Sequence, residues 1–177
     1  MRIKDPLLLG GFAGLIRNAV KLAGNIFNAY VLKISSTTYA EIAAGIFMTK
    51  KERRKKMGLV VGSIADLAIG ALLGIPVVYF LRYTGKDHAV IKGLGYGHFA
   101  WVLFYGALGS LFGAQGVFPL NASTNLSAII NHSLYGMTTA AVISKFGDPS
   151  LFPEPGGGCP AKNSTEQGNN MKPALLN

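Results

Sequence analysis

The residues best suited to chemistry in this chain are charged and amide side chains inside an apolar stretch at 7–32. Arg17, Lys21, Asn25 and Asn28 recur there at three- or four-residue spacing. At about 100° per residue, they project from one face of a helix. An ionised group near the centre of a bilayer costs about 2.5 kcal/mol or more, so this face should contact protein, water or an acid. Such a polar layer would either conduct ions or fix how the helices pack.

Asp66, in the second long apolar stretch, is the acid available to these cations. It belongs to a series of small residues at four-residue spacing (Gly62, Asp66, Gly70 and Gly74), which allows another helix to approach closely. Asp66 lies about 13 Å from the basic end of its helix. Lys21 matches that depth if the chain crosses the membrane four times, and Arg17 matches it if the chain crosses five times. We therefore predict an ion pair of Asp66 with Lys21 or with Arg17.

Two histidines, His98 and His132, complete the candidate layer in the third and fourth apolar stretches. Measured from the loop between these stretches, they lie about 22 Å and about 13 Å deep, a mismatch that one metal ion cannot bridge. We predict no metal site and no cofactor. Each histidine is expected to form hydrogen bonds in the helical core, with proton relay as the alternative. His132 shares a helix face with Tyr135 and Thr139, and this face should turn inward.

The serines of the apolar stretches have no base at a useful spacing. His132 and Ser133 are neighbours that point about 100° apart on a helix, which is the wrong geometry for a base and a nucleophile. The glycines at 93, 95 and 97 lack the preceding strand and the spacing of a phosphate-binding loop, and they are typical of close helix packing. The sequence predicts no catalytic residues, which argues against an enzyme.

A basic run separates the first two long apolar stretches. The chain has 177 residues and a formal net charge of +9, yet only 14% of its residues are charged and 50% are hydrophobic. Because a juxtamembrane cluster of positive charge suits an anionic bilayer, we expect anionic lipid head groups as partners and no nucleic acid. The run is expected on the cytoplasmic side. Its basic residues are Lys50, Lys51, Arg53, Arg54, Lys55 and Lys56.

Four stretches are long and apolar enough to place these residues on membrane-spanning helices, since a crossing needs about 20 residues. The first continues past Arg17 and Lys21 without a small-residue cleavage pattern, so we interpret it as a retained span and not as a cleaved signal. The four stretches cover about 7–32, 57–82, 92–113 and 124–145.

A shorter apolar segment at 37–49 predicts an interfacial or re-entrant helix that leads into the basic loop 50–56. Ser35, Ser36 or Thr37 would cap its first turn. If this helix does not cross, the four spans leave both termini outside. If it crosses, the amino terminus lies inside and the carboxyl terminus outside.

The composition changes to Pro, Gly, Asn and Ser from residue 147 onward. Such a segment buries too little apolar surface to offset the entropy lost on ordering. We therefore predict a helical bundle at 1–146 and a flexible tail at 147–177. The lone cysteine, Cys159, lies in this tail, so an intramolecular disulfide is excluded.

Four short motifs stand out in this chain: GGFAG at 10–14, YGHFAW at 96–101, FP at 118–119 and HSLYG at 132–136. With them, the chain resembles the small multi-pass membrane proteins of spore-forming Gram-positive bacteria, including the YqhR type. The motifs touch about half of the chain. The resemblance implies a helical bundle in the bacterial cytoplasmic membrane, and it assigns no activity.

Taken together, these observations predict an all-α integral membrane protein, a bundle of four transmembrane helices plus a short interfacial or re-entrant helix. We expect a structural or accessory membrane subunit, which acts as a homo-oligomer or within a larger membrane complex. The alternative is a small transporter or channel that uses the polar layer. A phage-type membrane-permeabilising protein and a membrane enzyme are the lesser alternatives.

Overall fold

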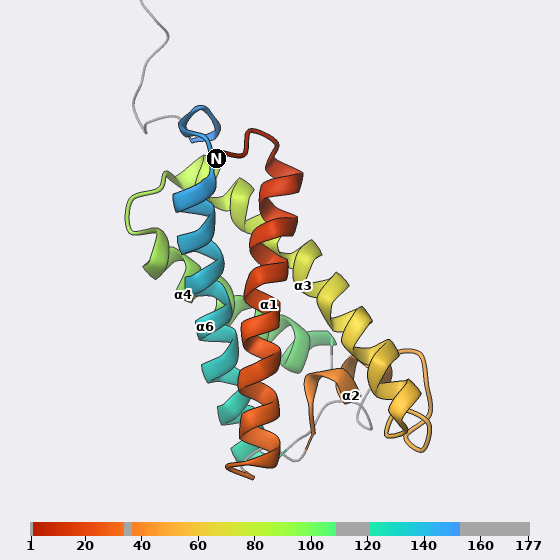
Figure 1. The fold of residues 1–177 in the computed structure, drawn as a ribbon. Coiled ribbons are helices and arrows are strands. Elements are labelled where there is room, and N and C mark those ends of the chain that lie inside the picture. Colours follow the sequence, from red (N-terminus) through yellow and green to blue (C-terminus); the bar gives the residue numbers. More distant parts are fainter. Residues whose placement is uncertain (1, 34–36, 109–120, 153–177) are drawn as a thin grey trace, which may run out of the picture.

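The structure is a computed structural model that describes residues 2–33, 37–108 and 121–152. In these residues the regular elements are helices, and the only β pairing is an isolated bridge between Ile3 and Gly147 (Figure 1). The predicted all-α class is confirmed. The long helices are α1 (Pro6–Tyr30), α3 (Lys56–Thr84), α4 (Ala89–Trp101) and α6 (Ala122–Phe146), and the short ones are α2 (Tyr39–Ala44), the π-helix η1 (Val102–Leu108) and the 3-10 helix η3 (Pro149–Leu151).

The long helices form two packed pairs. Helix α1 packs chiefly on α3, and α4 packs chiefly on α6. Contacts between α1 and α6 join the pairs, whereas α3 touches α4 and α6 only lightly. Both faces of the α1–α6 contact carry polar residues, so the centre of the molecule is lined by them.

Glycine allows α1 and α3 to approach until their backbones touch. A β-carbon built at Gly10 would lie 2.5 Å from the Cα of Ile75, and one built at Gly74 would overlap the carbonyl oxygen of Gly10. One turn further along, a β-carbon at Gly14 would overlap the carbonyl oxygen of Gly70. The small-residue series of the second apolar stretch therefore does form a close helix contact, and the two helices run antiparallel.

Close backbone contacts at glycine also join α4 to α6. A β-carbon at Gly93 would overlap the carbonyl oxygen of Gly136, and one at Gly97 would overlap that of His132. Gly95 has no such neighbour within 4 Å. Of the three glycines assigned to helix packing in this stretch, two therefore make the contact and the third does not.

Helix α2 is shorter than the predicted segment 37–49. Its N-cap lies one residue after the last of the three predicted cap positions. Thr38 is the N-cap: its side chain accepts the N–H of Glu41, whose own side chain accepts the N–H of Thr38. The predicted cap at Ser35, Ser36 or Thr37 is wrong in that Thr38 holds the position. Ala40 and Ala44 of α2 pack on Gly62 of α3, so α2 lies along the first part of α3.

The third predicted span begins at Ala89, before its predicted start at about residue 92, and changes from an α-helix to a π-helix. Helix α4 passes at Val102 into the π-helix η1, and the last residues of the predicted span, 109–113, lie outside the described residues. At the start of α4, the Nζ of Lys92 donates to the carbonyl oxygens of Thr84 (2.6 Å) and Gly85 (3.0 Å) and to Oδ1 of Asp87 (3.0 Å). The bond from Lys92 lowers the pKa of Asp87. Lys92 thereby satisfies carbonyls at the end of α3 and ties the two helices together.

Residues 147–152 are not part of a flexible tail. The N–H of Ile3 donates to the carbonyl of Phe146 (2.9 Å), and the N–H of Asp148 donates to that of Ile3 (3.0 Å). Leu151 and Phe152 then pack into the core next to Leu9 and other apolar residues. The prediction fails here because two apolar side chains suffice to hold the segment, whereas residues 153–177 and Cys159 lie outside the described residues.

Two helices, α1 over Pro6–Asn28 and α3 over Lys56–Thr84, are long and apolar enough to cross a membrane. Many large apolar side chains on these helices are exposed, among them Leu8, Val20 and Leu72. The helices α4 and α6 do not qualify: α4 has 13 residues, and α6 carries amides and histidine in its middle. By length and composition, two of the four predicted spans could therefore cross a membrane.

Candidate functional site

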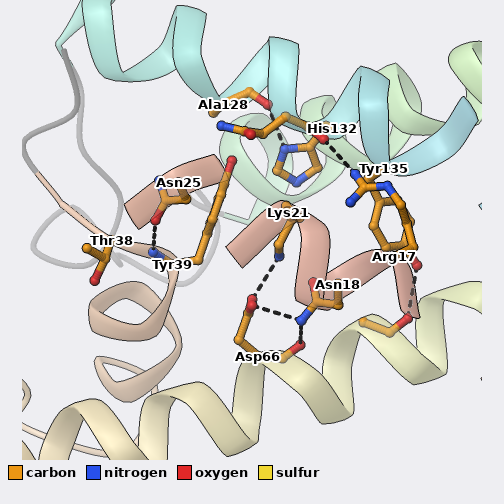
Figure 2. A network of polar contacts seen from close by, with 12 residues as sticks. Arg17, Asn18, Lys21, Asn25, Thr38, Tyr39, Asp66, Ala128, His132 and Tyr135 are labelled. Carbon is orange, nitrogen blue, oxygen red and sulfur yellow. Dashed lines mark hydrogen bonds and ion pairs between the residues drawn. The ribbon is translucent and has the colours of Figure 1, made fainter. Parts of the chain in front are cut away.

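The centre of the polar layer is an ion pair between Lys21 of α1 and Asp66 of α3 (Figure 2). The Nζ of Lys21 lies 2.9 Å from Oδ1 of Asp66, and the two residues are only 9% and 6% exposed. The predicted ion pair of Asp66 is confirmed, and its partner is Lys21 and not Arg17. The choice follows from helix register, because the Gly10–Gly74 and Gly14–Gly70 contacts bring the next turns, at Asn18 and Lys21, against Asp66.

Asn18 completes the environment of Asp66, a role that the sequence did not predict. Its Nδ2 donates to Oδ2 of Asp66 at 2.9 Å and to the backbone carbonyl of Asp66 at 2.7 Å. Both carboxylate oxygens therefore accept a hydrogen bond from a buried donor. The four-residue spacing of Asn18 from Gly14 was the available signal, because it places the amide on the face that contacts α3.

Arg17 turns the other way, toward α6. Its Nε donates to the carbonyl oxygen of Leu134 at 2.7 Å, and its Nη2 donates to that of Asn131 at 3.1 Å. The guanidinium also lies over the Tyr135 ring, 5.1 Å from the ring centroid. Arg17 is 0% exposed, and its Nη1 has no hydrogen-bond partner among the described residues. Its described contacts are thus to neutral groups and not to an acid.

The remaining polar residues of α1 hold α2 and α6. Oδ1 of Asn25 accepts the backbone N–H of Tyr39 at 2.7 Å, which fixes the start of α2. The centroid of the Tyr39 ring in turn lies 4.3 Å from the Nζ of Lys21. Asn28 donates to Oγ of Ser127 at 3.1 Å. The predicted polar stripe of α1 therefore faces protein along its length.

His132 is the core histidine that the sequence predicts. Its Nδ1 lies 2.8 Å from the carbonyl oxygen of Ala128, and since a carbonyl only accepts, Nδ1 carries the proton. The imidazole packs edge-on between Tyr39 and Tyr105, with ring centroids 5.9 Å and 5.7 Å away. The predicted inward face of α6 is also confirmed, because Tyr135 and Thr139 are buried with it.

His98 is not part of the layer, and the assignment of it to the core is wrong. It is exposed on α4, because Gly93, Gly97 and Ala100 occupy the face toward α6. Its Nε2 lies 2.8 Å from Oγ of Ser133. That hydroxyl also donates to the carbonyl of Ile129 at 2.8 Å, so its proton points away from the imidazole. An activated serine would instead donate its proton to the histidine.

Two tyrosines connect the helix pairs, and neither role was predicted. The hydroxyl of Tyr135 on α6 donates to the carbonyl of Gly70 at 2.9 Å, and that of Tyr96 on α4 donates to the carbonyl of Leu73, also at 2.9 Å. Both acceptors lie on α3, about one turn (Gly70) and about two turns (Leu73) beyond Asp66. These bonds hold the lightly packed α3 against the α4–α6 pair.

The basic loop presents most, but not all, of its predicted residues to the surface. Arg53 is 6% exposed and turns inward, so its assignment to the membrane-surface set is wrong. The cause is the close approach of the loop to α3, where a β-carbon at Gly58 would lie 2.8 Å from the Cα of Arg53. Lys55 pairs with Glu52 at 2.6 Å in an exposed contact. The exposed basic residues of the loop are Lys50, Lys51, Arg54, Lys55 and Lys56.

A half-open cavity of about 80 Å³ reaches the ion pair from the side. Its lining combines polar side chains, among them Lys21, Asp66 and His132, with apolar residues of α2, α3 and η1. No group of three or more His, Cys, Asp or Glu side chains in the described ranges could hold a metal ion.

Fold and site together define a helical protein with a buried ion pair and two helices able to cross a membrane. No protein-family model, curated protein or solved structure matches the chain.

Proposed function

We propose that this protein is a four-span protein of the bacterial cytoplasmic membrane that serves as a structural or accessory subunit, as a homo-oligomer or within a larger membrane complex. The proposal is supported mainly by the contacts of Asp66, whose two carboxylate oxygens accept hydrogen bonds from Lys21 and Asn18. A buried ion pair of this kind stabilises the register of α1 on α3 that the glycine contacts set. The likeness of the short motifs to the YqhR type supports the same location.

The four-span count rests on length as well as on hydropathy. The 13 residues of α4 pass directly into the 7 of η1, and together they provide about the 20 helical residues that a crossing needs. Helix α6 has 25 residues. Its buried Asn131 and His132 face the other helices and not lipid, so its low hydropathy does not prevent it from spanning.

We expect the amino terminus and the basic loop to lie on opposite sides of the membrane. Ile3 is paired with Gly147 at one end of the bundle, and α2 with the basic loop lies at the other (Figure 1). In a Cys159→Ser background, an impermeant maleimide should label Lys4→Cys in intact cells but Lys51→Cys only after permeabilisation. Labelling of Lys4→Cys only after permeabilisation would contradict four spans and favour five.

The exposed face of the basic loop is suited to anionic lipid. Ile46, Phe47 and Met57 are 58%, 68% and 75% exposed beside the basic residues, so apolar anchors accompany the charge. Each Lys or Arg near an anionic surface contributes about 1 kcal/mol. Spin-labelled phosphatidylglycerol should therefore associate more strongly than phosphatidylcholine, and salt or replacement of the exposed loop Lys and Arg by Gln should reduce this preference. As a control, Arg82 is exposed at the other end of α3, and Arg82→Gln should leave the preference for phosphatidylglycerol unchanged. Equal association of both lipids would contradict the assignment of the basic loop to anionic lipid.

Transport is the second candidate function, because the half-open cavity reaches the Lys21–Asp66 pair. Measurement of proton and potassium flux in proteoliposomes distinguishes the structural role from the transport role. For a structural subunit, wild type and Asp66→Asn should both leak no faster than protein-free liposomes. A leak in the wild type that Asp66→Asn removes, while the variant keeps its elution volume in size-exclusion chromatography, would replace the structural proposal by the transport one.

A further inference from the structure

The buried polar layer carries more positive than negative charge. Arg17 and Lys21 are both buried, and among the described residues Asp66 is the only buried acid. Asp66 already accepts from Lys21 and Asn18, while Arg17 contacts carbonyl oxygens and a tyrosine ring. The layer is therefore one negative charge short of neutrality. A buried charge without a counterion is costly, which favours an anion close to these two cations.

The cavity offers a place for that anion. The ammonium of Lys21 has three N–H donors, of which Asp66 takes one, and it lies 4.3 Å from the centroid of the Tyr39 ring. Lys21 and Tyr39 both line the cavity. The walls are aliphatic and aromatic: Ile42 and Ile46 from α2, Ile69 and Leu73 from α3, and Phe104 from η1. A ligand with one charged head and an apolar body matches this combination of one basic residue with mainly apolar lining residues. That η1 is a π-helix agrees with a ligand site, because π-helical segments occur frequently at functional sites.

From this geometry we infer that the cavity binds an amphiphile with a single carboxylate head and an aliphatic chain. The carboxylate accepts from the Nζ of Lys21 and neutralises the excess charge of Arg17, one helical turn away on α1. The chain lies between α2, α3 and η1 and leaves through the open side. The shared chemistry covers a free fatty acid and a lipid that carries a carboxylate. This inference goes beyond the structural role proposed above and does not depend on it.

Calorimetry in phosphatidylcholine nanodiscs tests the inference, with empty nanodiscs subtracted. Octanoate should bind at least ten-fold more tightly than octanol, which has the same chain and no charge. Arg17→Gln removes the excess charge without changing the cavity wall and should abolish this difference. Ala43→Leu narrows the cavity from α2 and should weaken both probes. Competition by phosphatidylserine in the nanodisc, with octanoate displaced, would assign the lipid as the source, and its absence would assign the free acid.

Two results would overturn the inference: equal affinity of wild type for octanoate and octanol, or an octanoate affinity that Arg17→Gln leaves unchanged. Octanoate affinities are compared directly only for variants whose unfolding temperature is close to that of wild type. If Arg17→Gln lowers this temperature, the ratio of its two affinities decides: simple loss of structure would weaken octanoate and octanol alike, whereas loss of the excess charge would weaken octanoate alone. Neither result depends on topology or on ion flux, so failure here would leave the proposed function standing.

Discussion

Replacement of Asp66 by leucine is expected to destabilise the protein by about 3–5 kcal/mol, the usual effect of removing one partner of a buried ion pair. The substitution would leave the Lys21 ammonium without its counterion at 9% exposure. It would also leave the Nδ2 of Asn18 with only the backbone carbonyl at residue 66 as an acceptor. Reversible unfolding in mixed micelles, followed by circular dichroism, measures the loss.

The matched control is the double variant Lys21→Met with Asp66→Leu. It removes both charges and replaces them with apolar side chains of similar volume, so it should recover most of the lost stability. Asn28→Leu, which breaks only a hydrogen bond to Ser127, should cost far less. If Asp66→Leu and Asn28→Leu have equal effects, Asp66 does not hold the register of α1 and α3.

Replacement of Gly97 by alanine should destabilise the α4–α6 pair by about 1–3 kcal/mol, because the new methyl group would overlap the carbonyl oxygen of His132. The helices would have to separate, and His132 and its contacts to Tyr39 and Tyr105 would move with them. The same unfolding measurement applies, and hydrogen exchange in α6 should rise.

Gly95→Ala provides the control on the same helix. A β-carbon at Gly95 meets nothing within 4 Å, so alanine there should be neutral or stabilising by up to about 1 kcal/mol through helix propensity. If the two alanine variants behave alike, then the effect reflects the helix propensity of glycine and not the close contact between α4 and α6.

Local patterns in the sequence determined the elements and their buried faces. The amide and basic residues of α1 recur with helical spacing, and the small residues of α3 recur every fourth position, so each face could be predicted from one helix alone. That Asp66 would pair with a cation followed from the cost of burying it unpaired, since Lys21 and Arg17 were the cations in reach.

Only the tertiary structure decided which groups meet. Lys21 and Arg17 lie on the same face of α1, but their partners differ. The glycine contacts fix the register of α1 on α3 and place Lys21 beside Asp66, whereas Arg17 reaches backbone carbonyls of α6. Arg53 turns inward because its loop folds onto Gly58, and His98 stays outside because the glycines of α4 occupy the contact face. Periodicity describes one helix in isolation, whereas these outcomes depend on distances between helices, which backbone contact sets.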